Sequence, residues 1–167
     1  KNLLIGLHNA FSEAMQDNKY ADKVLERTFK SNKKWGAKDR AFVSEVFYEI
    51  IRWKKHFEHY TQKPFEPEFI YHYIVAYLLF HKIPFESIPD FKTVYIKKIK
   101  ENFKKPFPSI AVRYSIPDWL MQRFEKELPK SWQKEMEILN KQAEVILRVN
   151  TLKTTPKKLI ERFAEDN

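Results

Sequence analysis

The chain has 167 residues, of which 43% are hydrophobic and 16% aromatic, so it can bury one sizeable core. It contains only two glycines and no cysteine, which excludes disulfides, a thiolate nucleophile, cysteine zinc sites and glycine-rich phosphate loops. Its 31 basic residues outnumber 22 acidic ones, and the net charge of +9 favours a polyanion such as nucleic acid as partner, although lysines that serve only solubility would give the same excess.

The first part of the chain is predicted to be a bundle of helices. Apolar residues at three- and four-residue steps predict helices over residues 3–16, 20–31 and about 37–61. Residues 68–82 are apolar on almost every side but form too short a run to cross a membrane, so we expect a central helix there. The expected core includes Phe42, Val46, Phe47, Ile50, Ile74, Tyr77 and Leu78.

A basic helix is expected over about residues 90–104, with Phe91, Val94, Tyr95, Ile99 and Phe103 facing inward. A short helical piece, "SIAVRY", follows the prolines at 106 and 108. The next helix begins in "SIPDWLMQRFEKEL", where Ser115 is the expected N-cap and Asp118 complements the helix dipole. "SWQKEMEILNKQ" predicts one more helix.

From Val145 on, the spacing of apolar residues changes from the helical three- and four-residue steps to alternation. Residues Val145 to Asn150 alternate between apolar and mostly polar side chains, which predicts a strand. Thr155 and Pro156 have the pattern of an N-cap and first-turn proline of a final helix. Because one strand cannot satisfy its own backbone groups, we expect its partners beyond Asn167, in a longer parent protein. A short edge strand that pairs with a loop, or a misassigned helix, are the alternatives.

Two motifs carry a resemblance to a known family. "RYSIPDWL", residues 113–120, and "LRVNTLKTT", residues 147–155, resemble the segment before the catalytic domain in RsmB/Sun (Fmu)-family 16S ribosomal RNA (cytosine-5) methyltransferases. "DRAFVSEVFYEIIRW" and "HKIP" resemble the NusB-like helical domain of the same enzymes, although the usual "GFVNAVLR" pattern is missing. The resemblance implies a mainly α chain: a NusB-like bundle over residues 1–112, then the start of an α/β RNA-binding subdomain over residues 113–167.

The same resemblance implies what the chain does and what it lacks. The parent would be a cytoplasmic, S-adenosylmethionine-dependent enzyme in which a cysteine attacks the target cytosine. Because this chain has no cysteine and no glycine loop, we expect neither catalytic residues nor cofactor binding within it. Its expected partner is ribosomal RNA, with no membrane; protein contacts of the NusB-like domain, the oligomeric state and the target cytosine stay open. The alternatives are a free-standing NusB-like module in transcription antitermination, or a protein-interaction domain without RNA affinity.

Candidate RNA contacts lie on the polar face of the predicted strand and on the basic helix. Arg148 and Asn150 should point away from the core, where arginine suits phosphate and asparagine a base edge or sugar, with Lys153 in the following loop. A second group could form a phosphate track: Lys97, Lys98, Lys100, Lys104 and Lys105. The alternatives are an internal salt bridge for Arg148 and a solvated helix face for the lysines.

Other residues suggest further hypotheses. Trp35 is flanked by lysines in a loop and is a candidate for stacking on bases. His56 and His59 have a spacing that could hold a metal, but no third ligand is visible. The charged residues of the long helix are typical of intrahelical ion pairs.

Overall fold

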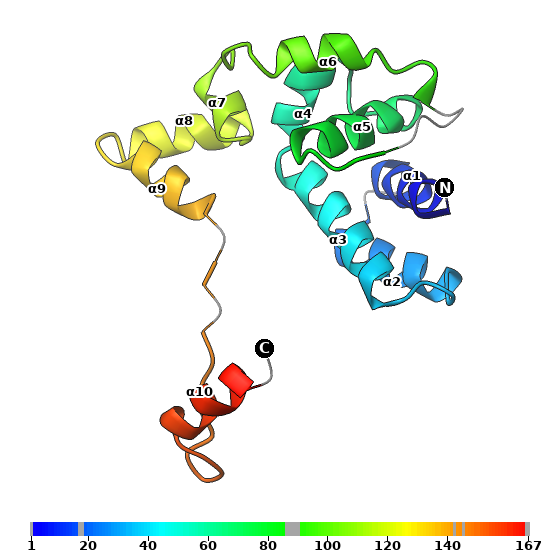
Figure 1. Ribbon diagram of the computed structural model, residues 1–167. Helices are drawn as coiled ribbons and strands as arrows, with labels where there is room; N and C mark the ends of the chain where they lie inside the picture. The colour runs from blue at the N-terminus through cyan, green and yellow to red at the C-terminus, as the bar shows by residue number, and fades with distance from the viewer. Residues whose placement is uncertain (1, 17–18, 86–90, 142, 145, 166–167) are drawn as a thin grey trace. The chain divides into compact units, whose positions relative to one another are not determined.

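A computed structural model of the chain describes residues 2–16, 19–85, 91–141, 143–144 and 146–165 (Figure 1). The chain divides into two compact units, Lys1–Trp132 and Gln133–Asn167, and each is treated by itself. Across these described ranges the regular structure is helical and contains no strand, which confirms the mainly α fold class. The domain boundary predicted at 112/113 stays a prediction.

The first unit is a bundle of short helices. They are α1 (Asn2–Gln16), α2 (Ala21–Ser31), α3 (Ala37–Arg52), α4 (Lys54–Thr61), the 3-10 helix η1 (Pro67–Phe69), α5 (Ile70–Phe80), α6 (Ile96–Asn102), α7 (Ile110–Arg113) and α8 (Asp118–Glu127). Helix α9 (Trp132–Leu139) begins at the last residue of this unit. Helix α10 (Pro156–Glu165) lies in the second unit.

Helix α5 is the centre of the bundle, as its apolar sequence predicts. It packs against α1, α3, α4 and α6, and nearly all of its side chains are buried. The predicted core is confirmed for Val46, Phe47, Ile50, Ile74, Tyr77 and Leu78. Phe42 is only half-buried, because Val43 occupies the buried position on that turn of α3.

The single helix predicted over residues 37–61 is wrong, because it breaks at Trp53. The Trp53 N–H donates to the Glu49 carbonyl at 2.8 Å and closes α3, while the Trp53 carbonyl accepts from His56 N–H at 2.9 Å and opens α4. Neither proline nor glycine marks this break in the sequence. Helix α4 packs against α5, α6 and α7, so its direction follows from tertiary contacts that periodicity does not contain.

Trp35 is part of the core, so its predicted role in stacking on bases is wrong. Only 9% of its surface is exposed, and its ring meets Phe29 edge-on at 6.4 Å between centroids. It also lies against Gly6 of α1, where a Cβ atom would stand 2.2 Å from the Trp35 Cη2 atom. Glycine at position 6 is therefore required by the close approach of this ring.

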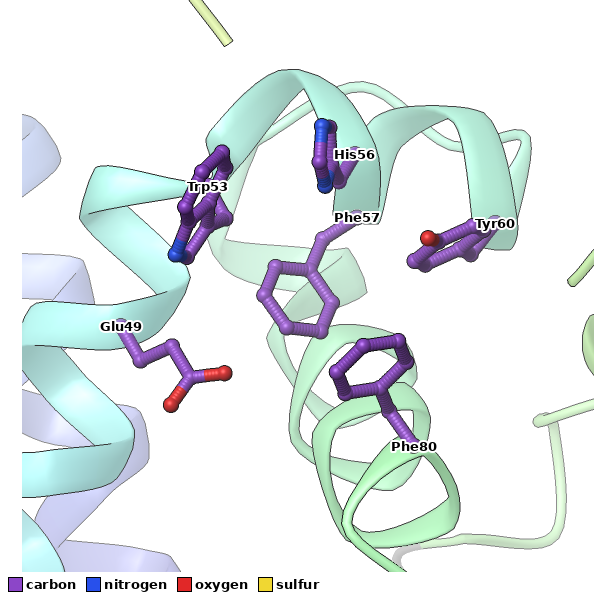
Figure 2. A pocket seen from close by; sticks show the side chains of 6 residues that line it. All are labelled: Glu49, Trp53, His56, Phe57, Tyr60 and Phe80. Atoms are coloured by element: carbon purple, nitrogen blue, oxygen red, sulfur yellow. The ribbon is translucent and has the colours of Figure 1, made fainter. Parts of the chain in front are cut away.

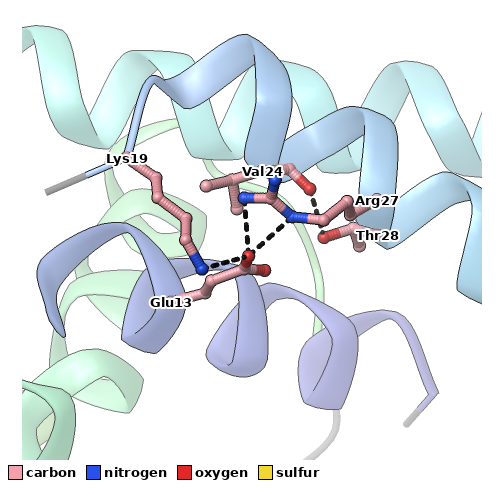
Figure 3. A network of polar contacts seen from close by, with 5 residues as sticks. All are labelled: Glu13, Lys19, Val24, Arg27 and Thr28. Atoms are coloured by element: carbon pink, nitrogen blue, oxygen red, sulfur yellow. Dashed lines mark hydrogen bonds and ion pairs between the residues drawn. The ribbon is translucent and has the colours of Figure 1, made fainter. Parts of the chain in front are cut away.

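A polar network joins α1 to α2 on the surface of the bundle (Figure 3). The Glu13 carboxylate accepts from Arg27 Nε at 2.7 Å and also pairs with Lys19 at 3.3 Å. Within α2, the Thr28 hydroxyl donates to the Val24 carbonyl at 2.9 Å. Because these ion pairs are exposed, each of them contributes little to the stability of the fold.

The "RYSIPD" motif attaches to the start of α4, and Ser115 is not the N-cap of the following helix. Ser115 has φ +51°, and its hydroxyl accepts from the Lys55 backbone N–H at 3.2 Å. Helix α8 begins at Asp118, whose carboxylate pairs with the Lys55 ammonium at 3.1 Å. Ser115 thus caps a different helix in space, one that lies sixty residues earlier in the sequence.

The basic helix is shorter than predicted. Asp90 lies outside the described residues, and α6 begins only at Ile96, after a turn in which Phe91 and Val94 are buried. Tyr95 precedes the helix and is 73% exposed, so its predicted inward position is wrong. The helical period does not extend to Tyr95 because its backbone, at φ −82° and ψ 78°, is not helical.

In the second unit the final helix forms as predicted but the strand does not. The Thr155 hydroxyl accepts from Lys158 N–H at 3.4 Å, and Pro156 is the first residue of α10. Residues 146–150 have no regular structure, and Val145 lies outside the described residues. Leu147 is 59% exposed rather than facing a core. No described segment pairs with residues 146–150, and a strand without a partner cannot satisfy its backbone groups.

Candidate nucleic-acid interface

Positive charge is concentrated around α6. Residues 91–105 contain six lysines and a single glutamate, a far stronger bias than that of the whole chain. All six lysine side chains are exposed. Such a local excess attracts phosphate groups and raises their concentration at the surface.

The packing of α6 explains why its lysines face solvent. Ile99 and Asn102 are buried, and the Asn102 side-chain amide donates to the Tyr60 carbonyl at 2.8 Å. This contact fixes the rotation of the helix about its axis and leaves the other positions outside. The ammonium groups of the lysines at 97, 98, 100 and 104 make no hydrogen bond or ion pair with any described residue. Lys105 differs, because its ammonium donates to the Asn102 side-chain oxygen at 2.7 Å.

A hollow beside α6 contains two residues that sequence reasoning missed. Lys63 and Tyr95 line it together with Lys98 and His72, and its volume is about 120 Å³. Burial, and then the nearby Lys63, lower the pKa of His72, which keeps that ring neutral. The residues that line the hollow therefore include two lysines and one exposed aromatic ring. No sequence signal could place Lys63 there, because it comes from the loop after α4.

A second cavity, of about 220 Å³, is lined almost wholly by aromatic side chains (Figure 2). Its lining residues are Glu49, Trp53, His56, Phe57, Tyr60 and Phe80. The Glu49 carboxylate and the rings of Trp53, Phe57 and Phe80 point toward a common space in this view. The same carboxylate accepts from His81 Nε2 at 2.5 Å. It is the one acidic group among the residues that line the cavity.

His56 holds one wall of this aromatic pocket in place. Its ring is stacked between Trp53 and Phe107, with centroid distances of 4.7 and 4.4 Å. Its Nε2 donates to the Arg113 carbonyl at 2.8 Å, which makes Nε2 the protonated nitrogen of the neutral ring. Burial lowers the pKa of His56 below its ordinary value.

The histidines at 56 and 59 have no metal partner in the part of the chain that the structure describes. No group of three His, Cys, Asp or Glu residues with metal-ligand geometry occurs among the described residues. One His56 ring nitrogen is already bonded to the Arg113 carbonyl.

In the same described ranges, no helix is both long and apolar enough to traverse a bilayer.

The candidate contacts of the second unit are exposed. Arg148, Asn150 and Lys153 all face solvent, and the first two line one shallow hollow. Asn150 shapes the following turn: its side-chain oxygen accepts from Leu152 N–H at 3.1 Å, and its carbonyl accepts from Lys153 N–H at 2.9 Å. The Asn150 amide group still offers N–H donors to a ligand. These residues and the lysines of α6 belong to different units, so their predicted continuity stays a prediction.

Comparison with known proteins gives one match. Residues 116–167 match the family model described as Methyltr_RsmF/B-like, ferredoxin-like domain. Neither the curated proteins nor the solved structures gave a match. The matched family does not cover the first 115 residues, so the NusB-like character of the helical bundle stays a prediction. For residues 116–167, the match confirms the predicted resemblance to the RsmB-type ribosomal RNA methyltransferases.

Proposed function

We propose that this chain is the RNA-binding N-terminal region of an S-adenosylmethionine-dependent ribosomal RNA 5-methylcytosine methyltransferase. It would hold ribosomal RNA for a catalytic domain elsewhere in the parent protein, in the cytoplasm. The observation that carries the proposal is the family match over residues 116–167. It favours this function over a free-standing NusB-like module, because such a module does not need a ferredoxin-like segment.

The lysines of α6 support the RNA-binding part of the proposal. An ammonium group without a partner in the protein loses no internal contact when it binds phosphate. Each phosphate that a protein neutralises releases counterions, so affinity falls with salt at a log–log slope of about −0.7 per phosphate on a single strand. Lys97, Lys98 and Lys100 together would then account for a slope of roughly −2. Arg148 would add a bidentate phosphate contact from the second unit.

Two variants test these contacts on fragments of 16S ribosomal RNA across a salt series. A Lys97/Lys98/Lys100 triple alanine variant should bind more weakly and with a flatter slope, and Arg148→Ala should bind more weakly. A Lys33/Lys34/Lys38 triple alanine variant is the matched control, since it removes the same charge from exposed positions elsewhere in the first unit. If the control and the α6 variant behave alike, only net charge matters and the proposed contacts are wrong.

The enzymatic part of the proposal has its own test. The gene should continue past residue 167 into a glycine-rich cofactor loop and a cysteine motif. A stop codon at that point would contradict a methyltransferase parent and leave the binding module as the better explanation. The same result would not affect the salt-series measurement, so the two parts of the proposal can fail separately.

A further inference from the structure

We propose that the aromatic pocket formed by Glu49, Trp53, Phe57, Tyr60 and Phe80 receives an unpaired nucleobase that carries an exocyclic amino group, and that Glu49 selects it. The inference rests on the proposed RNA-binding function and adds a base-recognition site to it. Unpaired bases are read in this way by many RNA-binding proteins, which stack them on aromatic rings and bond their polar edges.

The pocket adjoins the basic surface of α6. Phe103 directly follows α6, and its ring meets Tyr60 edge-on at 4.7 Å and Phe80 at 6.1 Å between centroids. In the sequence, Phe103 stands between Lys100 and Lys104, both exposed and without partners among the described residues. The Phe103 ring thus links the lysine-rich end of α6 to two residues that line the pocket, and a strand whose phosphates bind these lysines would have the pocket within its reach.

The size and lining of the pocket suit a single base. Its volume of about 220 Å³ lies below the several hundred Å³ typical of sites for whole cofactors or drug-sized ligands. Phe80 is 49% exposed at the rim, although large apolar rings are usually buried. A base that stacks on such a ring covers apolar surface that is otherwise open to water, and stacking tolerates any base because every base has a π-face.

Glu49 gives the pocket a preference for bases that carry an amino group. One Glu49 oxygen, Oε1, accepts from His81, which leaves Oε2 as the acceptor for a ligand. Because an ionised carboxylate only accepts hydrogen bonds, it attracts the amino group of cytosine or adenine and repels the O4 carbonyl of uracil. A lysine or arginine side chain from a protein partner would satisfy the same carboxylate. The lysines on either side of Phe103 in the sequence, Lys100 and Lys104, disfavour that occupant, because positive charge near the pocket repels a basic segment and attracts a nucleic acid.

Short fluorescent homopolymers of C, A and U provide the test with the full 167-residue chain. The unaltered protein should bind oligo(C) and oligo(A) about fivefold or more tightly than oligo(U), the factor expected for one net hydrogen bond. Glu49→Gln should abolish this difference, because an amide can both donate and accept. Glu45→Gln is the matched control, since Glu45 is an exposed residue one turn earlier on α3 and does not line the pocket.

The contribution of stacking is tested at the exposed rim. Phe80→Ala should lower the affinity for all three homopolymers at least about fivefold. This is the lower end of the loss seen when a stacking aromatic is removed. Tyr20→Ala, which removes an exposed aromatic ring before α2, should leave the three affinities unchanged. Equal binding of C and U by the unaltered protein would overturn the proposal, as would a preference that survives Glu49→Gln. Binding of arginine amide in the absence of any homopolymer binding would also overturn the proposal, and would assign the pocket to a basic protein partner. None of these outcomes changes the salt slope that tests the α6 lysines.

Discussion

Gly6→Ala tests the packing of the bundle at its tightest point. Alanine is favoured over glycine inside a helix by about 0.8–1.0 kcal/mol, so a position with free space would gain stability. Here the new Cβ atom would stand 2.2 Å from Trp35 Cη2 and 2.7 Å from Cζ2. Because the indole is buried, this clash can be removed only by a shift of α1 or of the ring. Overpacking of this kind costs about 1–3 kcal/mol. We expect a net loss of about 1–2 kcal/mol.

Urea unfolding of three variants measures this effect. Asn9→Ala, at an exposed position on the same helix, should gain a few tenths of a kcal/mol and reports propensity alone. Trp35→Phe removes the clashing atoms, so it should be less damaging in the Gly6→Ala background than in the unaltered protein, with a coupling of about 1 kcal/mol. If Gly6→Ala gains stability as Asn9→Ala does, the placement of Trp35 against α1 is wrong.

Four further outcomes follow from the structure. Phe47→Ala should cost about 3–5 kcal/mol in urea unfolding because the ring is fully buried, and a loss below ~1 kcal/mol would contradict that burial. Ser115→Ala should cost about 1 kcal/mol, as the loss of a cap does, since the Lys55 N–H loses its acceptor; an unchanged urea midpoint would show that water replaces the hydroxyl. Burial lowers the pKa of His56, so the unfolded chain takes up the proton first; stability should be constant above pH 6.5 and decline below it, and His56→Gln should decline less. Calorimetric titration should detect no binding of S-adenosylmethionine to this chain, and micromolar binding would contradict the assignment of the cofactor to another part of the parent.

Helix faces were the most predictable feature of the sequence. The central position of α5 and the burial of Val46, Phe47 and Ile50 follow directly from apolar spacing, and both are confirmed. The break at Trp53 could not be predicted, because no proline or glycine marks it and the apolar stripe continues across one non-helical residue. The burial of Trp35 could not be predicted from its neighbours, because the lysines around it are exposed while its own ring packs against Gly6.

The candidate interface shows the same division between local and long-range signals. The lysines of α6 were found because charge is visible in the sequence, and the structure explains their exposure through the buried Asn102. Glu49 and Phe80 are far apart in sequence and meet only because α3, α4 and α5 pack together, so the aromatic pocket had no sequence signature. Ser115 was assigned as a cap from a correct local pattern, but its hydroxyl serves α4 instead of α8.

Ultraviolet cross-linking of the chain to 16S ribosomal RNA, followed by mass spectrometry of the cross-linked peptides, tests the central claim most directly. We expect cross-links in two segments, residues 95–105 around α6 and residues 148–153 of the second unit. Competition with unlabelled ribosomal RNA should remove them, and the Lys97/Lys98/Lys100 triple alanine variant should lose the first set while keeping the second. Cross-links confined to α1 and α2, or none at all at moderate salt, would contradict the RNA-binding function proposed for this chain.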